Sequence, residues 1–257
     1  MLFVAVEAAK KAGVLLAAHV GGPREISFKG EINLVTEMDR RSEKIVVTML
    51  NAAFPDHGIL AEEGAYVENR SRFLWIIDPL DGTTNYAHGY PNFAVSIGLE
   101  EAGEIVAGVV YDPMRDELFT AIKESGAMLN GRPIRVSGTT SLIRSLLATG
   151  FPYDRVISPE NNLKYFNRMI MASQEIRRSG SAALDLCAVA AGRLDGYWEL
   201  KLHPWDVAAG YIIVREAGGV VSDISGSRSD IREKTIVASN GSIHDQMLEV
   251  LQQDAEG

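Results

Sequence analysis

The stretch WIIDPLDGTTNYAHG, residues 75–89, combines an apolar run with a polar turn. The apolar run predicts a strand covered on both faces. The strand ends in two carboxylates, Asp78 and Asp81, with Pro79 and Leu80 between them. Because proline stiffens the turn, the two side chains can converge on one point. Their like charges would repel there unless a cation lay between them.

The composition of this turn suits a metal ion and an anion together. Mg2+ prefers oxygen ligands, and the Leu80 carbonyl can join the two carboxylates because a turn leaves backbone oxygens unpaired. Gly82, Thr83 and Thr84 follow at once and offer backbone N–H groups at the start of a helix, where phosphates bind. The turn therefore predicts metal-assisted phosphoryl transfer.

Further carboxylates lie at the ends of other predicted elements. Glu62 and Glu63 close the predicted strand HGILAEEG, Asp206 follows His-Pro-Trp at the start of a helix, and Asp39 lies near the start of another. Each has a structural alternative, because Asp is a common helix cap and a strand end is often solvated. The joint pattern of carboxylates at element ends favours ligands.

The bulk composition limits the class of protein. The chain has 257 residues, a formal net charge of -9 and a pI of about 5.1, which argues against a surface that coats nucleic acid. A single cysteine, Cys187, lies in an apolar helical run and suits a buried thiol in a reducing compartment. No stretch is apolar enough for a membrane span, so we expect a cytoplasmic protein without membrane partners.

The chain divides into two halves of different character. Residues 1–137 contain two helices and a run of short apolar segments separated by turns, which predicts an antiparallel meander. Residues 138–257 alternate predicted strands and helices, which favours a mainly parallel sheet. In this half Ser158-Pro159-Glu160 is expected to open a helix and Ser242 to cap the last one. The fold class is therefore α+β.

Four segments together resemble the inositol monophosphatase family, and they follow one another along nearly the whole chain: AEEG, WIIDPLDGTTNYAHGYPNFAVSIGL, RRSGSAALDLCAVAAGRLDGYWE and HPWDVAAGYIIVREAGG. The resemblance implies a layered αβαβα sandwich of the inositol monophosphatase and fructose-1,6-bisphosphatase type. It also implies a homodimeric, lithium-sensitive phosphatase that uses two to three Mg2+ ions to hydrolyse inositol monophosphate by in-line attack of a metal-activated water.

The resemblance implies a role for each matching residue. The metal ligands are Glu62, Asp78, the Leu80 carbonyl, Asp81 and Asp206. The catalytic residues are Glu62, Thr83 and Asp39, with Thr83 hydrogen-bonded toward Asp39 to orient the attacking water. The phosphate and the cyclitol or sugar contact Asp81, Gly82, Thr83, Gly180, Ser181, Ala182, Glu199 and Asp206.

The chain also departs from the mammalian enzymes of this family. Lys29 resembles a family lysine near the metals, but its spacing to Asp39 is one residue shorter. The segment GAYVENRSRFL, residues 64–74, is shorter too, which would open the mouth of the site. Arg177 and Arg178 suit a substrate contact, a dimer contact or a surface strand end equally, and His203 is expected to be structural.

Several alternatives compete with inositol monophosphate hydrolysis. Phosphoadenosine phosphatases and histidinol phosphatases commonly carry lysine where this chain has Thr84, whereas dual activity on fructose 1,6-bisphosphate stays open. A haloacid-dehalogenase phosphatase would use one aspartate as a nucleophile, but its DxDGT motif has a shorter spacing. The non-enzymatic alternative is a protein-binding regulator that retains the site.

Overall fold

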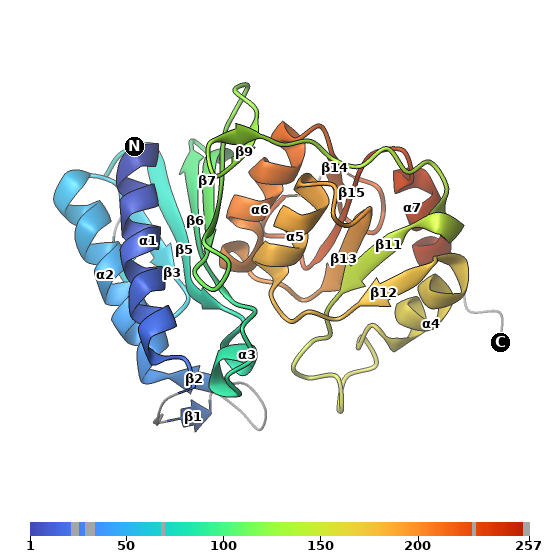
Figure 1. Cartoon of the computed structure of the whole chain (residues 1–257), viewed down its shortest axis with the longest axis horizontal. Coiled ribbons are helices and arrows are strands. Elements are labelled where there is room, and N and C mark those ends of the chain that lie inside the picture. The colour runs from blue at the N-terminus through green and yellow to red at the C-terminus, as the bar shows by residue number, and fades with distance from the viewer. Residues whose placement is uncertain (22–25, 29–33, 68–69, 228–229, 254–257) are drawn as a thin grey trace.

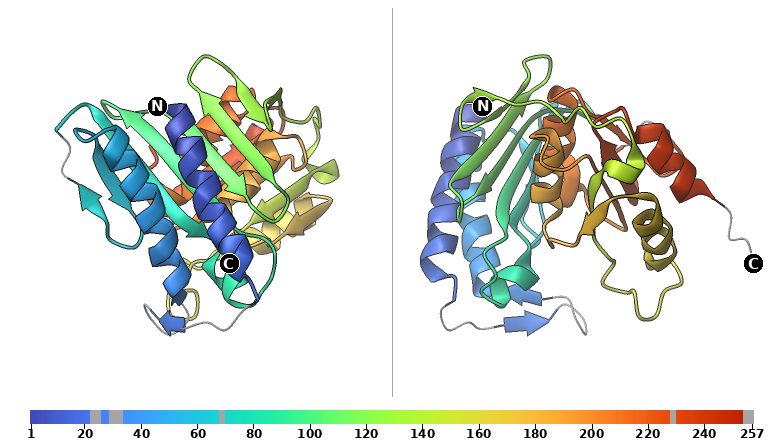
Figure 2. Two further views of the ribbon diagram at one scale, coloured as in Figure 1. Left: turned by 60° about the vertical axis from the view of Figure 1, so that its left-hand side comes forward. Right: turned by 45° about the vertical axis from the view of Figure 1, so that its right-hand side comes forward.

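Five alternating layers of helix and sheet make up the molecule. The computed structural model describes residues 1–21, 26–28, 34–67, 70–227 and 230–253, with the backbone alone for 26–28 and 34–36. Lys29 lies outside the described residues. Figures 1 and 2 show the layers in the order α1 with α2, a large sheet, α5 with α6, a small sheet, and α4 with α7. The α-helices are α1 (Leu2–His19), α2 (Glu37–Ala53), α3 (Thr83–Ala87), α4 (Leu163–Ala172), α5 (Ala182–Ala190), α6 (Pro204–Glu216) and α7 (His244–Gln252).

The large sheet is almost wholly antiparallel. Its eight described strands follow the order β10-β9-β8-β7-β6-β5-β3-β4, and within this sheet only the described pair β3–β5 is parallel. The strands are β3 (Gly58–Ala61), β4 (Tyr66–Val67), β5 (Phe73–Asp81), β6 (Ala94–Glu101), β7 (Glu104–Asp112), β8 (Glu117–Ile122), β9 (Ala127–Leu129) and β10 (Arg132–Pro133). The meander from β5 to β10 confirms the prediction for this half.

The small sheet mixes both directions. It orders as β12-β11-β13-β15-β14, where β11 is parallel to β12 and β13 while β15 is antiparallel to both of its neighbours. Four of its five strands therefore run one way. The strands are β11 (Leu146–Thr149), β12 (Glu175–Arg177), β13 (Gly196–Leu200), β14 (Val220–Ser222) and β15 (Thr235–Ser239). A separate pair, β1 (Ile26–Phe28) and β2 (Leu34–Thr36), and a short 3-10 helix, Leu142–Arg144, complete the described elements.

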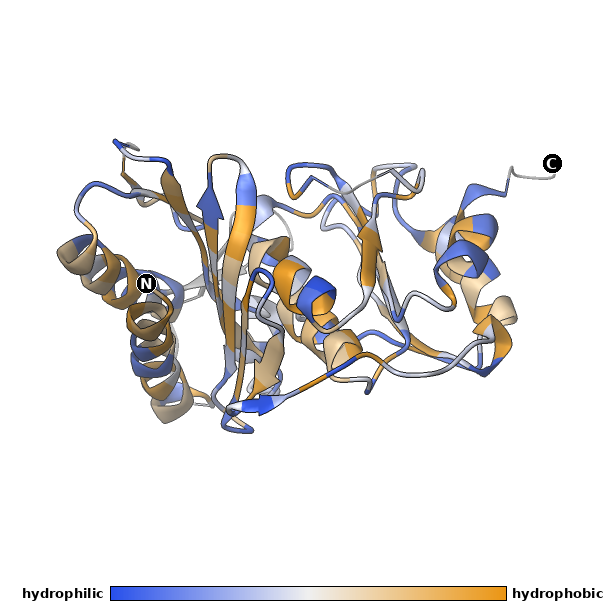
Figure 3. Ribbon diagram, turned by 90° about the horizontal axis from the view of Figure 1, so that it is seen from above, coloured by the Kyte–Doolittle hydropathy of each residue, from blue (hydrophilic) through white to orange (hydrophobic). Residues whose placement is uncertain are grey.

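Three apolar clusters fill the spaces between the layers. One lies between α1, α2 and the large sheet and includes Trp75; another surrounds α5 and α6 and includes Cys187; the third joins the small sheet to α4 and α7. In Figure 3 the strands and the helices between the sheets carry most of the hydrophobic colour, whereas the connecting loops are largely hydrophilic. The buried Cys187 confirms the expected core thiol.

Two paired glycines let α6 lie directly on the large sheet. Gly98 on β6 is opposite Gly108 on β7 in the strand register. A Cβ on Gly98 would lie 2.7 Å from the Ala208 Cβ, and one on Gly108 would lie 2.7 Å from the Ala209 carbonyl oxygen. Because α6 also carries Asp206 in its first turn, this close contact fixes the position of Asp206 relative to the sheet.

Two predicted helix starts are wrong. The helix expected to open at Ser158 begins at Leu163, because Ser158 accepts a hydrogen bond from Lys201 and the chain turns through Asn162 at φ 70°. The last helix begins at His244 with Ile243 at its N-cap, and the Ile243 amide bonds the Asn240 side chain. No helix in the described part of the chain has the length and apolar character that crossing a bilayer requires.

The glycine contact generates a stability prediction. Gly108→Ala should lower the free energy of unfolding by about 1–3 kcal/mol, because the new methyl group meets helix backbone that cannot move aside. Gly138→Ala is the matched control, since a Cβ there has nothing within 4 Å. Urea unfolding of both variants measures the difference, and equal midpoints would show that α6 has room to shift.

Candidate active site

One large cavity lies where strands of both sheets end. It encloses about 1050 Å³, and its walls come from the turn after β5, the segment after β11, the start of α5, the end of β13 and the start of α6. β3 runs parallel to β5, and its last residue, Ala61, is paired with Ile77. Glu62, whose amide donates to the Ile77 carbonyl, therefore lies beside Asp78. Loop side chains at the ends of strands are the usual source of binding groups in layered folds.

The turn after β5 is shaped by a bulge and a glycine. The register between β5 and β6 shifts between Asp78 and Asp81, which changes the direction of the strand as it enters the cavity. Gly82 then adopts φ 96°, and a Cβ there would lie 2.9 Å from the Asn92 carbonyl oxygen. Only glycine fits this position. The short helix α3 starts directly afterwards, so the Gly82 and Thr83 amides lie at its N-terminus, as the sequence predicts.

The predicted hydrogen bond between Thr83 and Asp39 is present. Thr83 Oγ1 lies 3.0 Å from Asp39 Oδ1 and 3.0 Å from the Leu80 carbonyl oxygen, and both Thr83 and Asp39 are buried. Asp39 lies in the first turn of α2, which is further tied to the β5 turn by the Ser42 hydroxyl, 2.6 Å from the Pro79 carbonyl. Two helices and a strand therefore fix the orientation of the Thr83 hydroxyl.

Asp81 joins the two halves of the chain. Its Oδ2 accepts hydrogen bonds from the Ser181 hydroxyl at 2.5 Å and the Ala183 amide at 2.8 Å, and its Oδ1 accepts one from the Ala182 amide at 3.3 Å. These donors form the N-terminus of α5, whose partial positive charge stabilises a carboxylate. The structure thus brings together four residues that the sequence assigned to one site, and all four line the cavity: Asp81, Gly180, Ser181 and Ala182.

The acidic residues of the cavity repel one another. Burial raises the pKa of Asp78 well above its usual range, and the charges of Glu62, Asp81 and Asp206 raise it further. Burial likewise raises the pKa of Asp206, again with contributions from Asp81 and Glu62, and it raises the pKa of Asp81 to about 6. Four carboxylates from both halves of the chain therefore face the same space.

The donor set fits a hard divalent cation. All of the predicted ligand groups are carboxylate or carbonyl oxygens, and mutual repulsion of buried carboxylates is what a bound cation relieves. As they stand, no three His, Cys, Asp or Glu side chains among the described residues converge on one ion position. Backbone amides occupy part of the acceptor capacity: Leu80 N donates to Asp78, and His203 N donates to Asp206. Asp206 thus takes part in capping α6, but as the N3 residue of a capping box whose N-cap is His203, and its second oxygen is left for another ligand.

The opposite end of the cavity suits a polar substrate. Burial raises the pKa of Glu199 to about 7, and the Tyr197 hydroxyl donates to it at 2.5 Å. A Cβ on Gly150 would lie 2.1 Å from Glu199 Oε1, so glycine makes room for that carboxylate. Arg178 lines the cavity, and its charge offsets part of the rise in pKa that burial causes in Asp81, Asp185 and Glu199. Arg177 is exposed, and its guanidinium lies 3.8 Å from the Glu175 carboxylate.

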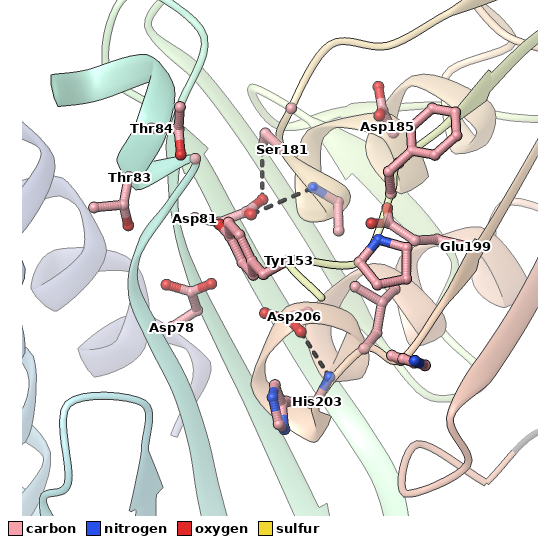
Figure 4. Close-up of a pocket in the computed structure, with 18 of the residues that line it drawn as sticks. Asp78, Asp81, Thr83, Thr84, Tyr153, Ser181, Asp185, Glu199, His203 and Asp206 are labelled. Carbon is pink, nitrogen blue, oxygen red and sulfur yellow. Dashed lines mark hydrogen bonds between the residues drawn. The ribbon is translucent and has the colours of Figure 1, made fainter. Parts of the chain in front are cut away.

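The cavity also contains residues to which the sequence assigned no role. Tyr153, Asp185 and Lys201 line it, and Figure 4 shows Tyr153 near Asp81 and Asp206. The segment Gly-Phe-Pro-Tyr directly follows β11, as Glu62 directly follows β3 and as Asp81 ends β5. This shared position at the end of a strand could have indicated Tyr153 from the sequence. His203, which lines the cavity, stacks its ring on Trp205 at a centroid distance of 4.8 Å.

The comparisons with known proteins agree with this geometry. The sequence profile of the inositol monophosphatase family matches residues 1–256, so the chain belongs to that family. A Synechocystis protein named inositol-1-monophosphatase is 50% identical over 252 residues, which cover 97% of this chain and 88% of that protein. A Pseudomonas aeruginosa protein named Nus factor SuhB is 44% identical over 259 residues, covering 98% and 96%.

A solved structure gives the same result for the fold. The inositol monophosphatase from Anabaena superposes with a TM-score of 0.90 at 48% identity, over 98% of this chain and 95% of that one. The predicted αβαβα fold and family are confirmed. The family is one of metal-dependent phosphatases that act on phosphorylated substrates, and this assignment replaces the haloacid-dehalogenase alternative.

The repelling carboxylates generate a prediction about metal binding. Saturating Mg2+ at neutral pH should raise the Tm by about 5 °C, because an ion that binds only the folded state stabilises it. Asp206→Asn should remove most of this shift, whereas Asp245→Asn, an exposed change on α7, should retain it. Thermal unfolding with and without Mg2+ measures both, and an unchanged shift in Asp206→Asn would contradict a role for Asp206 in metal binding.

Proposed function

We propose that this protein is a Mg2+-dependent phosphomonoesterase that hydrolyses inositol monophosphate to inositol and phosphate. The main support is the position of Asp81, which lies in the turn next to the Gly82 and Thr83 amides and also on the N-terminus of α5. One carboxylate thereby connects a phosphate site with the wall that carries Ser181 and Glu199. The names of the Synechocystis and Anabaena relatives add support for the substrate.

Each residue of the site has a defined task in this proposal. Bound divalent cations, held by Glu62, Asp78, the Leu80 carbonyl, Asp81 and Asp206, would activate the attacking water and stabilise the leaving oxygen. The Gly82 and Thr83 amides hold the phosphate, and the Thr83 hydroxyl accepts a hydrogen bond from the attacking water while its own proton points to Asp39.

The remaining groups orient the alcohol part of the ester. Glu199 and the backbone of Gly180, Ser181 and Ala182 face the substrate hydroxyl groups, and Asp206 lies near the leaving oxygen. A carboxylate that accepts hydrogen bonds from two hydroxyl groups favours a polyol over an apolar alcohol. Dual activity on fructose 1,6-bisphosphate is the alternative substrate choice.

We further propose two to three Mg2+ ions per site, lithium sensitivity, a homodimer and a cytoplasmic location, each by analogy with the family. In this proposal, residues 1–137 form the half that carries the metal-binding turn. Residues 138–257 form the half that selects the substrate. Neither nucleic acid nor a membrane is required as a partner.

A panel of phosphate esters tests the proposed activity. Inositol 1-phosphate should give the highest kcat/KM, above fructose 1,6-bisphosphate and phosphoadenosine phosphate, and chelation of Mg2+ should abolish release of phosphate. If no ester released phosphate with Mg2+ or Mn2+, the proposed function would be wrong. If fructose 1,6-bisphosphate were the best substrate, the dual activity would replace inositol monophosphate hydrolysis as the proposed function.

A regulatory role is the second candidate, because the Pseudomonas aeruginosa relative is named a Nus factor. Such a role would depend on the surface of the protein, whereas turnover depends on the cavity. Asp206→Asn separates the two, since turnover should vanish while binding of a protein partner should persist.

A conservative substitution should lower the activity most at Asp81. Asp81→Asn should lower kcat at least 1000-fold at every Mg2+ concentration, because the amide loses both a charged ligand and an acceptor for the α5 amides. Asp230→Asn, a change at an exposed aspartate, is the matched control. Phosphate release across a Mg2+ titration measures the effect, and near-normal turnover of Asp81→Asn would refute the assignment.

A change at Glu62 should differ in its effect from Asp81→Asn. Glu62 lies at the end of β3, and its loss should weaken the affinity for Mg2+ at only one of the proposed metal positions. Glu62→Gln should raise the Mg2+ concentration for half-maximal activity about tenfold, and excess Mg2+ should restore part of kcat. Glu63→Gln controls for the loss of charge at this strand end, since Glu63 does not line the cavity. If excess Mg2+ restored nothing, Glu62 would have a role beyond metal binding.

A further inference from the structure

The segment between β11 and α4, residues 150–162, forms a loop closed at its base; we call it the cavity loop. The Asn162 side-chain amide donates to the Gly150 carbonyl at 2.5 Å and to Thr149 Oγ1 at 2.9 Å. Trp198 Nε1 donates to the Asn162 side-chain oxygen at 2.8 Å. One buried amide thus holds both ends of the loop together against β13, which is the construction of a compact Ω-loop.

The middle of the cavity loop is fixed by a lysine from the end of β13. Lys201 Nζ lies 2.7 Å from Asp154 Oδ2 and 2.7 Å from Ser158 Oγ. The tip beyond this contact projects from the lower side of the molecule in Figure 1, and Val156 and Ile157 there are 83% and 86% exposed. The loop is therefore anchored on its inner side and free only at its tip.

Tyr153, which precedes Asp154, extends from this anchored side into the cavity. Half of its surface is exposed, and its side chain lines the cavity together with Thr84. Figure 4 shows Tyr153 near Asp81 and Asp206, so its side chain lies at the acidic end of the cavity. Asp81 directly precedes the Gly82 and Thr83 amides, so Tyr153 lies on the side of the cavity proposed for the phosphate rather than on the polyol side.

We propose that Tyr153 is a substrate-positioning residue whose hydroxyl donates a hydrogen bond to the phosphate group of the ester, and that Lys201 holds it in place through the cavity loop. This inference rests on the proposed phosphatase function. A phenol can donate a hydrogen bond to a phosphate oxygen while its own oxygen accepts one from another group. Burial raises the pKa of Tyr153 to about 12, so the hydroxyl keeps that proton at neutral pH. A cationic donor at this position would form ion pairs with the neighbouring carboxylates. A neutral hydroxyl can donate to the phosphate and leave those carboxylates available as metal ligands.

Tyr153→Phe tests the contact, because it removes the hydroxyl and leaves the ring. KM for inositol 1-phosphate should rise about tenfold, while kcat and the Mg2+ concentration for half-maximal activity stay within about twofold. The Kd of inorganic phosphate, measured calorimetrically with Mg2+ present, should rise by the same factor as KM, because phosphate alone carries the contact. Tyr66→Phe, an exposed tyrosine on β4, should leave all of these values unchanged.

Lys201→Met tests the anchoring. It should raise KM in the wild-type background and have little further effect in Tyr153→Phe, because both changes remove the same contact. Additive effects would show that Lys201 binds the substrate directly and would overturn its positioning role.

Two other results would overturn the proposal. Unchanged KM and phosphate affinity in Tyr153→Phe would show that the hydroxyl makes no contact with phosphate. A rise in KM without a change in the Kd of phosphate would assign the contact to the polyol instead. Failure of the wild-type protein to hydrolyse any ester would refute the proposed function alone, since the calorimetric comparison with phosphate would still decide the role of Tyr153.

Discussion

The site depends on one carboxylate that two distant parts of the chain share. Asp81 ends a strand of the large sheet and accepts three hydrogen bonds from the start of α5, about a hundred residues later in the sequence. Because α5 and α6 lie between the two sheets, this contact ties the β5 turn to the layer that also carries Asp206. The Asn85 and Asn92 side chains, which donate to the Ser179 carbonyl, support this contact between the proposed metal-binding turn and the proposed substrate wall.

The same arrangement makes the cavity electrostatically unfavourable when empty. Asp78 is buried and Asp206 is partly buried, and burial raises the pKa of each, with a further contribution from the charges of neighbouring carboxylates. Hydrogen bonds from Leu80 N and His203 N compensate only part of this cost. A fold that maintains buried, mutually repelling carboxylates is suited to bind cations, and the proposed reaction uses that property.

Much of this site could be predicted from the sequence because its main parts are local. The spacing in DPLDGTT places two carboxylates, a carbonyl and a helix N-terminus within one turn, and the family motif supplied the long-range pair Thr83 and Asp39. The layered fold followed from the same resemblance and from the change from meander to alternating elements.

The cavity loop could not be predicted in this way. Ser158-Pro159 has the local signal of a helix start, but contacts with Lys201 and Trp198, 36 to 47 residues away, decide where α4 begins. The direction of Tyr153 depends on the same long-range contacts. Local sequence patterns carry no information about such contacts.

A crystal structure grown with Mn2+ and inorganic phosphate, with the ions located by anomalous scattering, tests the central claim most directly. We expect at least two ions about 4 Å apart between Asp78, Asp81 and Asp206, with phosphate against the Gly82 and Thr83 amides. Ions bound only outside the cavity, or phosphate bound away from the β5 turn, would contradict the account.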